Sequence, residues 1–238
     1  MEYKNNLKKL GVIGGMGPEA SYYYYGEVIK HTKAEKDQEH IDMVILSHAT
    51  MPDRTTAIIT KDDKELIKTI CNDAKTLESL GVSNIAITCN TSHYFYDHIQ
   101  KAVNIPVINM VHESVAYAVR EFENVKRIGI MGTDGTINSK IYHKECRKLG
   151  VTPVKPSEER QKDVMSLIYD DIKSGKTGDK KKFDRVMAEF MRKGCVADIL
   201  ACTVFSVYKS NHDVPSVCLD AMDVLVRESI LRSGAEYR

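Results

Sequence analysis

Apolar and polar positions along this chain of 238 residues follow two different periods. Short apolar runs that end in glycine or in small polar residues predict buried parallel strands, at 9–14, 42–46, 85–89, 127–132 and 198–202. Apolar residues spaced three or four positions apart predict helices over 62–80, 113–122 and 182–193. Strands that alternate with helices predict an α/β fold with parallel sheets.

Three segments of the first half have counterparts, in the same order, in the second half. Residues 9–14 resemble 127–132, residues 85–93 resemble 198–206, and residues 104–109 resemble 213–218. This pattern indicates an internal duplication. We therefore predict two similar doubly wound domains related by a pseudo-twofold axis, one made of 1–114 plus 217–238 and the other of 115–216. Ligands of open α/β sheets bind beyond the carboxyl ends of the strands, which predicts a site in the cleft between the domains.

Composition and charge narrow the classes of partner. The formal net charge is +1, which provides no electrostatic reason to bind nucleic acid or an anionic membrane. No segment approaches the ~20 apolar residues of a membrane helix, and the N-terminus lacks an apolar signal core, so we expect a cytosolic protein. The six cysteines form no C-x-x-C pair and the histidines show no ligand spacing, which argues against disulfides and against a metal site.

Two of the cysteines lie at matching places in the two halves. Cys89 and Cys202 each follow an apolar run at the predicted carboxyl end of a strand. A lone buried cysteine is usually a core residue, but a polar cluster follows Cys89, at 90–93. A helix that begins near Ser92 would present free backbone amides to a thiolate and to a substrate carboxylate. Two thiols facing each other across one cleft could remove a proton from one face of a carbon and deliver one to the other.

The glycine-rich loop and the tyrosine run have plainer interpretations. Residues 15–20 fit G-x-G-x-x-A, but the following strand ends in Ser47-His48 without the carboxylate that a dinucleotide ribose requires, so a dinucleotide-dependent oxidoreductase is disfavoured. A glycine turn that leads into a helix can bind any anion, including a carboxylate. Tyr22 to Tyr25 would cover every side of a helix, so we expect some to face the core and others solvent or a partner subunit.

Together these motifs resemble those of one family. The segments that carry the resemblance are 14–18 (GGMGP), 51–55 (MPDRT), 89–93 (CNTSH), 161–164 (QKDV) and 201–203 (ACT). On them, the chain resembles the PLP-independent aspartate/glutamate racemases, and in particular the aspartate racemase branch. The resemblance implies two similar α/β domains in a homodimer, a small acidic amino acid as substrate, and a two-base mechanism without a cofactor.

Residue by residue, the resemblance implies the following roles. Cys89 and Cys202 are the acid/base pair. The other implied site residues are Asn90 and Thr91 for the α-carboxylate, Met16, Thr133 and Thr203 in the substrate pocket, and Arg54 and Lys162 for the distal carboxylate. His93 is expected to orient the loop by hydrogen bonding rather than to tune Cys89. The planar guanidinium of Arg54 suits bidentate pairing with a carboxylate.

Two positions depart from the family pattern. Val204 stands where relatives commonly have glutamate, and Ala201 where glycine is usual. Valine can neither accept a proton nor pair with a substrate ammonium group, so the sequence leaves open aspartate, glutamate or another substrate. The alternatives are a different enzyme on this scaffold (hydantoin racemase, maleate isomerase or arylmalonate decarboxylase) and a non-catalytic amino-acid-binding protein.

Overall fold

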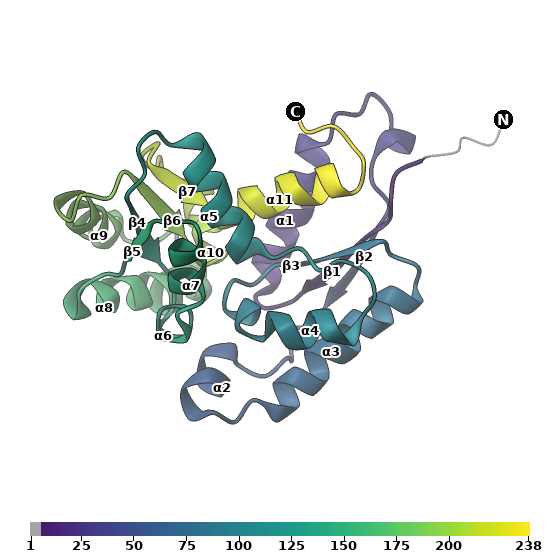
Figure 1. Ribbon diagram of the computed structural model, residues 1–238, viewed down its shortest axis with the longest axis horizontal. Coiled ribbons are helices and arrows are strands. Elements are labelled where there is room, and N and C mark those ends of the chain that lie inside the picture. The colour runs from purple at the N-terminus through teal and green to yellow at the C-terminus, as the bar shows by residue number, and fades with distance from the viewer. Residues whose placement is uncertain (1–5) are drawn as a thin grey trace.

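The computed structural model of the protein describes residues 6–238, which form two parallel sheets in two lobes (Figure 1). The first sheet has the order β2-β1-β3, and its strands are β1 (Leu10–Gly14), β2 (Met43–Ser47) and β3 (Asn84–Ile87). The second has the order β5-β4-β6-β7, and its strands are β4 (Arg127–Met131), β5 (Thr152–Val154), β6 (Ala197–Leu200) and β7 (Cys218–Asp220). The predicted α/β fold with parallel sheets is confirmed.

The two sheets repeat one topology. The first strand of each half is central and pairs in parallel with the second and third strands, so β1 corresponds to β4. Beside β3, an isolated parallel bridge between Ile85 and Val107 occupies the position that β7 takes beside β6. The sequence similarities therefore reflect a structural duplication.

Helices connect the strands and cover both faces of each sheet. They are α1 (Pro18–His31), α2 (Arg54–Thr60), α3 (Lys64–Ser79), α4 (Tyr96–Ala102), α5 (Met110–Glu121), α6 (Asp134–Ser139), α7 (Ile141–Lys148), α8 (Glu158–Ser166), α9 (Lys180–Arg192), α10 (Val204–Asn211) and α11 (Ala221–Arg232). Short 3-10 turns are η1 (Asp37–Glu39), η2 (Thr91–Phe95) and η4 (Ile172–Ser174), and η3 (Leu167–Asp171) is a π-helical turn. The helix predicted over 113–122 begins earlier, at Met110, because the Asn109 side chain caps it by accepting from the His112 amide at 3.1 Å.

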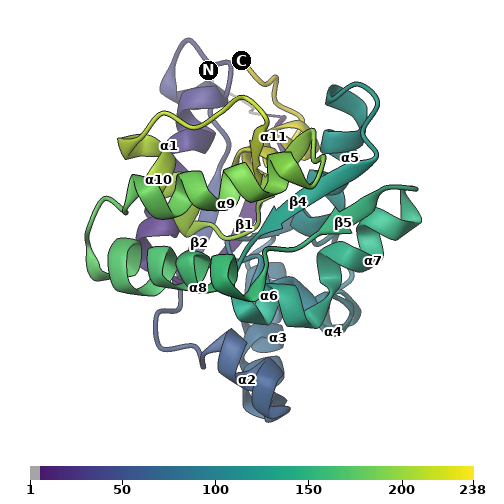
Figure 2. The same cartoon turned by 90° about the vertical axis from the view of Figure 1, so that its left-hand side faces the viewer.

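Side chains of the central strands alternate between buried clusters. Leu10 and Val12 of β1 lie in one cluster together with Ile128 and Ile130 of β4, whereas Ile13 packs on the other face with α3 and α4. A third cluster lies between the second sheet and α8 and α9, which Figure 2 shows in front of that sheet. Because the first cluster contains residues of both sheets, the two halves share a hydrophobic core.

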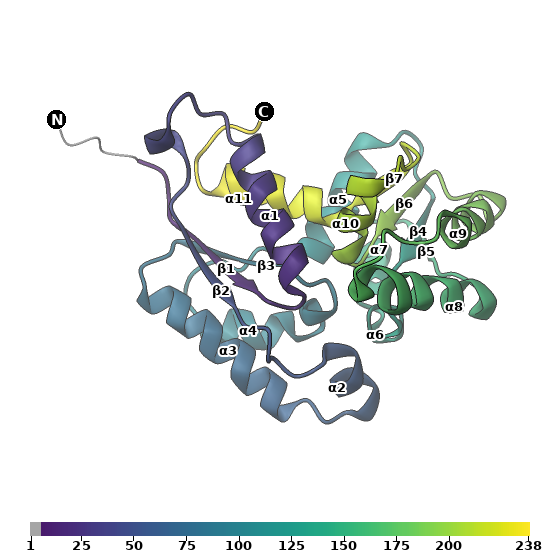
Figure 3. The ribbon, with the colours of Figure 1, turned by 180° about the vertical axis from the view of Figure 1, so that it is seen from behind.

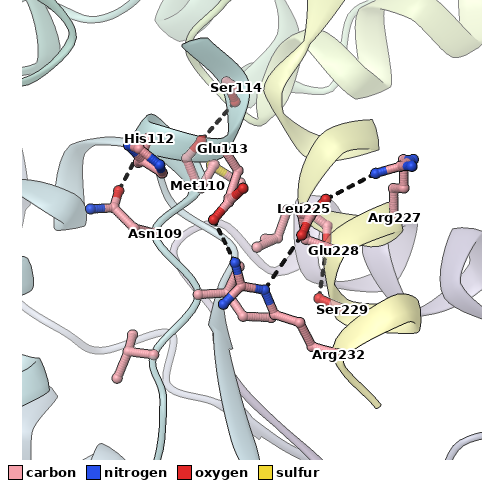
Figure 4. A network of polar contacts seen from close by, with 12 residues as sticks. Asn109, Met110, His112, Glu113, Ser114, Leu225, Arg227, Glu228, Ser229 and Arg232 are labelled. Atoms are coloured by element: carbon pink, nitrogen blue, oxygen red, sulfur yellow. Dashed lines mark hydrogen bonds and ion pairs between the residues drawn. The ribbon is translucent and has the colours of Figure 1, made fainter. Parts of the chain in front are cut away.

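The chain crosses between the halves at α5 and α11, which pack against each other. Arg232 of α11 donates to Glu113 of α5 at 2.5 Å and to Glu228 at 3.4 Å (Figure 4). Helix α11 also packs on α1, whereas β7, just before it, pairs with β6 of the second sheet. The division into 1–114 plus 217–238 and 115–216 stays a prediction.

The four consecutive tyrosines of α1 divide between core and surface. Tyr24 is fully buried and donates to Ser229 of α11 at 2.6 Å, while 79% of Tyr22 and 43% of Tyr25 are exposed. Helix α1 packs against both α11 and α10, and Figure 3 shows it crossing in front of α11. The predicted split between buried and exposed tyrosines is confirmed. Within the described chain, 6–238, no helix is both long and apolar enough to span a membrane.

Candidate active site

The two predicted cysteines line one small cavity between the sheets. Cys89 follows β3 and Cys202 follows β6, and both are free thiols that are almost entirely buried. The cavity that they share has a volume of about 20 Å³. Since about 10–15 Å³ suffices for one water molecule, the cavity has room for about one. The carboxyl ends of equivalent strands thus bring the two thiols together.

Most of the other predicted residues lie in the same cavity. Met16, Arg54, Asn90, Thr91, Thr133 and Thr203 all line it. Lys162 does not: it is exposed on α8 and lines a separate cavity of about 730 Å³ with Asp134 and Lys155. The cation that lines this cavity with Arg54 is Lys173, so the structure does not bring Lys162 together with Arg54 at the cysteines.

Sequence reasoning also missed Tyr169 and Asp53, which line the cysteine cavity with Lys173. Tyr169 lies in the π-helical turn η3, and Lys173 follows four residues later with its ammonium nitrogen 4.2 Å from the centre of the Tyr169 ring. Turns of this type are common at functional sites. The Tyr-x-x-x-Lys spacing is the one sequence signal that could have indicated the pair.

Three threonine hydroxyls join the two halves at the base of the site. Thr91 Oγ1 lies 3.1 Å from Thr133 Oγ1 and 3.0 Å from Thr136 Oγ1, and all three residues are buried. Thr91 follows β3, whereas Thr133 and Thr136 belong to the equivalent turn after β4 and the start of α6. The hydroxyl cluster therefore fixes the loop after β3 against the loop after β4.

Asn90 is held with its amide nitrogen available. Its side-chain oxygen accepts a hydrogen bond from the Tyr142 hydroxyl of α7, and Nδ2 has no partner among the described residues although it is buried. A buried donor without a partner is costly, and a bound carboxylate would satisfy it. Asn90 lines the cysteine cavity, as a ligand for a substrate carboxylate must.

His93 makes contacts with the backbone of the loop that carries Cys89. Its Nδ1 lies 2.9 Å from the Cys89 carbonyl oxygen, and its Nε2 accepts from the Met110 amide at 3.1 Å. Nδ1 therefore carries the proton and donates it to the carbonyl. Burial lowers the pKa of His93, although hydrogen bonds to backbone groups oppose that shift, so the ring is neutral. His93 thus ties the Cys89 loop to the start of α5.

The charges around the cavity assign protonation states. Burial raises the pKa of Cys202 to about 11, against the lowering effects of the Val204 amide, Lys173 and Arg54. Cys202 is therefore a neutral thiol near pH 7. For Asp53, burial is outweighed by hydrogen bonds from Thr56 and by Arg54 and Lys173, so its pKa lies below the usual range and it is a carboxylate.

Val204 begins α10 and forms part of the cavity wall. Among the described residues that line the cavity, Asp53 carries the one carboxylate. Asp53 directly precedes Arg54 and caps α2 by accepting from the Thr56 amide at 2.8 Å.

In residues 6–238, no group of three or more His, Cys, Asp or Glu side chains is placed to hold a metal ion.

Arg54 is only partly satisfied within the protein. One terminal nitrogen donates to the carbonyl oxygens of Pro52, at 3.0 Å, and Met51, at 3.3 Å, while the buried Nε has no partner in the part of the chain described. Arg54 and Lys173 lie in the wall between the cysteine cavity and a larger neighbouring cavity. They are therefore available to a negatively charged group that enters from that side.

The glycine loop before α1 forms another part of the wall. Gly15 has a φ of +85°, and a Cβ there would lie 2.4 Å from the His48 backbone nitrogen, so only glycine fits. The Gly15 amide donates to the Ser21 hydroxyl oxygen at 2.9 Å. That oxygen also lies 3.1 Å from the hydroxyl oxygen of Thr88, the residue before Cys89. These contacts hold the loop, and with it Met16, against the strand that carries Cys89.

Comparison with known proteins agrees with this geometry. The family model described as Asp/Glu/Hydantoin racemase matches residues 13–229. The broad specificity amino-acid racemase RacX of Bacillus subtilis (strain 168) is 33% identical over 148 residues, which is 59% of this chain and 61% of that protein. The glutamate racemase of Persephonella marina is 34% identical over 91 residues, 38% of this chain and 35% of that protein. The matched regions thus cover less than two thirds of the length of either relative.

Among solved structures, an aspartate racemase of Picrophilus torridus superposes with a TM-score of 0.80 at 25% identity, covering 97% of this chain and 96% of that one. A glutamate racemase of Francisella tularensis, solved with D-glutamate, has a TM-score of 0.63 at 20% identity over 94% of this chain and 79% of that one, which shows the fold alone. With the family model matching from β1 to α11, the chain belongs to the Asp/Glu/Hydantoin racemase family.

Proposed function

We propose that this protein is a cofactor-independent amino-acid racemase that interconverts L- and D-aspartate, with glutamate as a second candidate substrate. The observation that supports the proposal most strongly is that Cys89 and Cys202, at equivalent places in two related halves, line one small cavity. Family membership and the likeness to an aspartate racemase support the same assignment.

In the proposed reaction, the thiolate of one cysteine removes the hydrogen from the substrate α-carbon. The electron pair of that bond moves onto the α-carboxylate, and the thiol of the other cysteine gives its proton to the opposite face. The first cysteine ends as a thiol and the second as a thiolate, so protons and charge balance. Because Cys202 is protonated near pH 7, its thiol can supply the proton that the opposite face of the α-carbon receives.

The remaining residues bind the substrate. The Asn90 amide, which has an unpartnered donor, holds the α-carboxylate with Thr91, since stabilising that group also stabilises the carbanion. Arg54 and Lys173 bind the distal carboxylate, and Asp53 accepts from the ammonium group in place of the glutamate that Val204 replaces. Met16, Thr133 and Thr203 complete the wall.

Isotope exchange tests this proposal. Aspartate incubated with the protein in D₂O should acquire deuterium at the α-carbon, while the enantiomers equilibrate on a chiral column. Cys89→Ser and Cys202→Ser should each abolish racemisation, whereas Cys71→Ser, which changes a partly exposed thiol of α3, serves as the matched control. No exchange with either enantiomer of aspartate or glutamate would refute the proposed activity.

The same assay tests whether Lys173, rather than Lys162, binds the distal carboxylate with Arg54. Lys173→Met should raise the KM for aspartate by about 10- to 100-fold, the worth of one hydrogen bond to a charged group. Lys162→Met makes the same chemical change on α8, outside the cysteine cavity, and should leave that KM close to the wild-type value. The reverse result would restore Lys162 to the site.

We further propose that the protein is a homodimer of the cytosol. All six cysteines are free, as is usual in a reducing compartment. Tyr22, Tyr25 and Ile29 form an exposed stripe on one side of α1, which a second subunit could cover. Sedimentation analysis tests the dimer, and a monomer at micromolar concentration would exclude it.

One observation favours a different outcome. Val204 removes the carboxylate that relatives commonly place beside the second cysteine, which would suit a related isomerase or decarboxylase, or a protein that binds amino acids without turnover. Calorimetry with D- and L-aspartate separates these possibilities, because tight binding without exchange indicates a non-catalytic protein.

A further inference from the structure

A second cavity adjoins the cysteine cavity. It has a volume of about 450 Å³, within the range of about 300–1,000 Å³ typical of small-molecule sites. Its wall comprises Gly15 to Ala20, Ala49, Arg54, Ile172, Lys173, Val204 and Val207. We call this space the antechamber. It shares Met16, Arg54, Lys173 and Val204 with the cysteine cavity, so these four side chains alone lie in both walls.

The size of the cysteine cavity determines where a substrate can extend. A space of about 20 Å³ holds one water molecule, so an amino acid fits only if shared wall residues move aside. Asn90 and Thr91 line the cysteine cavity but not the antechamber. A substrate whose carboxylate is held at those two residues can extend its side chain past the shared residues into the antechamber.

The antechamber is mainly apolar beyond the two cations. Ile172 and Val204 are buried, Val207 is half-buried, and Pro18 and Ala49 complete its apolar surface. Helix α10, which supplies both valines, packs beside α1, as Figure 3 shows. With valine at 204, no carboxylate interrupts this side of the wall, and Glu19 on the α1 side is exposed to solvent.

Both cations already have partners within the protein. Lys173 lies over the Tyr169 ring at 4.2 Å, and Arg54 donates to the backbone carbonyl of Pro52 at 3.0 Å. An uncharged side chain that passes them therefore does not strand a cation without any interaction. It would also exchange contact with water for contact with Ile172, Val204 and Val207, which is favourable for an apolar group.

We propose that the antechamber is a side-chain subsite, and that the protein accepts amino acids whose side chains are apolar and longer than that of aspartate, of the size of leucine or methionine. This inference rests on the proposed racemase function. It adds a substrate class and assigns Val204 and Val207 as residues that determine specificity.

The test is α-deuterium exchange in D₂O with five L-amino acids: aspartate, glutamate, leucine, methionine and phenylalanine. The expected result is exchange with leucine and methionine well above that of heat-inactivated protein. Exchange with aspartate or glutamate but with none of the three apolar amino acids would overturn the inference and leave the racemase proposal intact. No exchange with any of the five would overturn both.

Variants that fill the antechamber test whether the substrate side chain binds there. Val207→Phe on α10 and Ala49→Leu after β2, both in the antechamber wall, should each lower the ratio of kcat/KM for methionine to that for aspartate by at least about tenfold. Val119→Phe makes the matched change on the exposed side of α5, at a residue that lines neither cavity. That control should keep the wild-type ratio. If one filled variant fails to fold in a thermal melt, the other carries the test, and an unchanged ratio in a folded variant refutes the placement.

Discussion

Replacing Gly135 with alanine tests how closely the two halves approach at the site. Gly135 lies at the start of α6, and a Cβ there would be 2.8 Å from Thr55 Oγ1, 3.0 Å from Thr55 Cα and 3.0 Å from Thr91 Cγ2. One of these atoms belongs to the backbone of α2, so rotation of a side chain cannot relieve all three contacts. The extra methyl group must push α2 away from α6.

The expected loss of stability is the difference between two effects. Overpacking of this kind costs about 1–3 kcal/mol, while alanine in place of glycine in a helix contributes up to about 1 kcal/mol. With the alanine gain taken at about 1 kcal/mol, the net loss is about 0–2 kcal/mol, which lowers Tm by up to about 8 °C in a chain of this length. Because Thr55 follows Arg54, displacement of α2 should also lower racemase kcat/KM, and a shift of about 1 Å at a reacting site can cost about 100-fold.

Thermal unfolding and the D₂O exchange assay measure the two effects. The matched control is Gly26→Ala in α1, where an added Cβ meets no atom within 4 Å. This control should gain about 0.5–1 kcal/mol from the helical preference of alanine. If Gly135→Ala melts at or above the wild-type temperature and keeps full activity, the halves do not pack as closely as described.

Three further changes probe other parts of the molecule. Burial raises the pKa of Asp198 to about 7, so the carboxyl group keeps its proton to higher pH in the folded state than in the unfolded state. The free energy of unfolding of the wild type therefore falls as the pH rises from about 4 to about 7, and the stability of Asp198→Asn relative to wild type should rise over that range by up to about 4 kcal/mol. An equal stability difference in urea unfolding at pH 4 and at pH 8 would contradict this. Tyr142→Phe leaves the buried Asn90 oxygen without its donor, which should cost about 1–3 kcal/mol in chemical denaturation and weaken racemisation; full activity would separate Asn90 from the reaction. Arg232→Met removes the partly exposed ion pair with Glu113 and should cost only about 0.2–1 kcal/mol, a difference that 1 M salt suppresses; a larger or salt-independent loss would show that the pair acts through packing.

Local patterns were enough to predict the fold class. The apolar runs at Leu10–Gly14 and Arg127–Met131 are the central strands of the two sheets, and such runs indicate strands buried on both faces. Gly81 and Gly194, which directly follow the helices predicted over 62–80 and 182–193, both have positive φ, of +73° and +75°. These features depend on residues near one another in the chain, so sequence alone reveals them.

The juxtaposition of the two thiols was also predictable, because topology imposes it. Parallel strands joined by crossover helices present all their carboxyl ends at one edge, so a cysteine after β3 and a cysteine after β6 must face the same cleft once the halves are related by duplication. The roles expected for Asn90, Thr91 and His93 came from the family resemblance of the motif 89–93, in which they follow Cys89.

Only the tertiary structure decided which side chains complete the site. The sequence indicated Lys162, but α8 ends in a π-helical turn, which shifts the following residues out of the α-helical register and turns Tyr169 and Lys173 toward the cleft. Tyr142 reaches Asn90 across 52 residues, and Gly135 is required by a contact with α2. Such contacts depend on how distant segments pack. The chain's periodicity therefore determined the strands, the helices and the edge where the thiols meet, whereas three-dimensional packing determined the rest of the site and the apolar antechamber beside it.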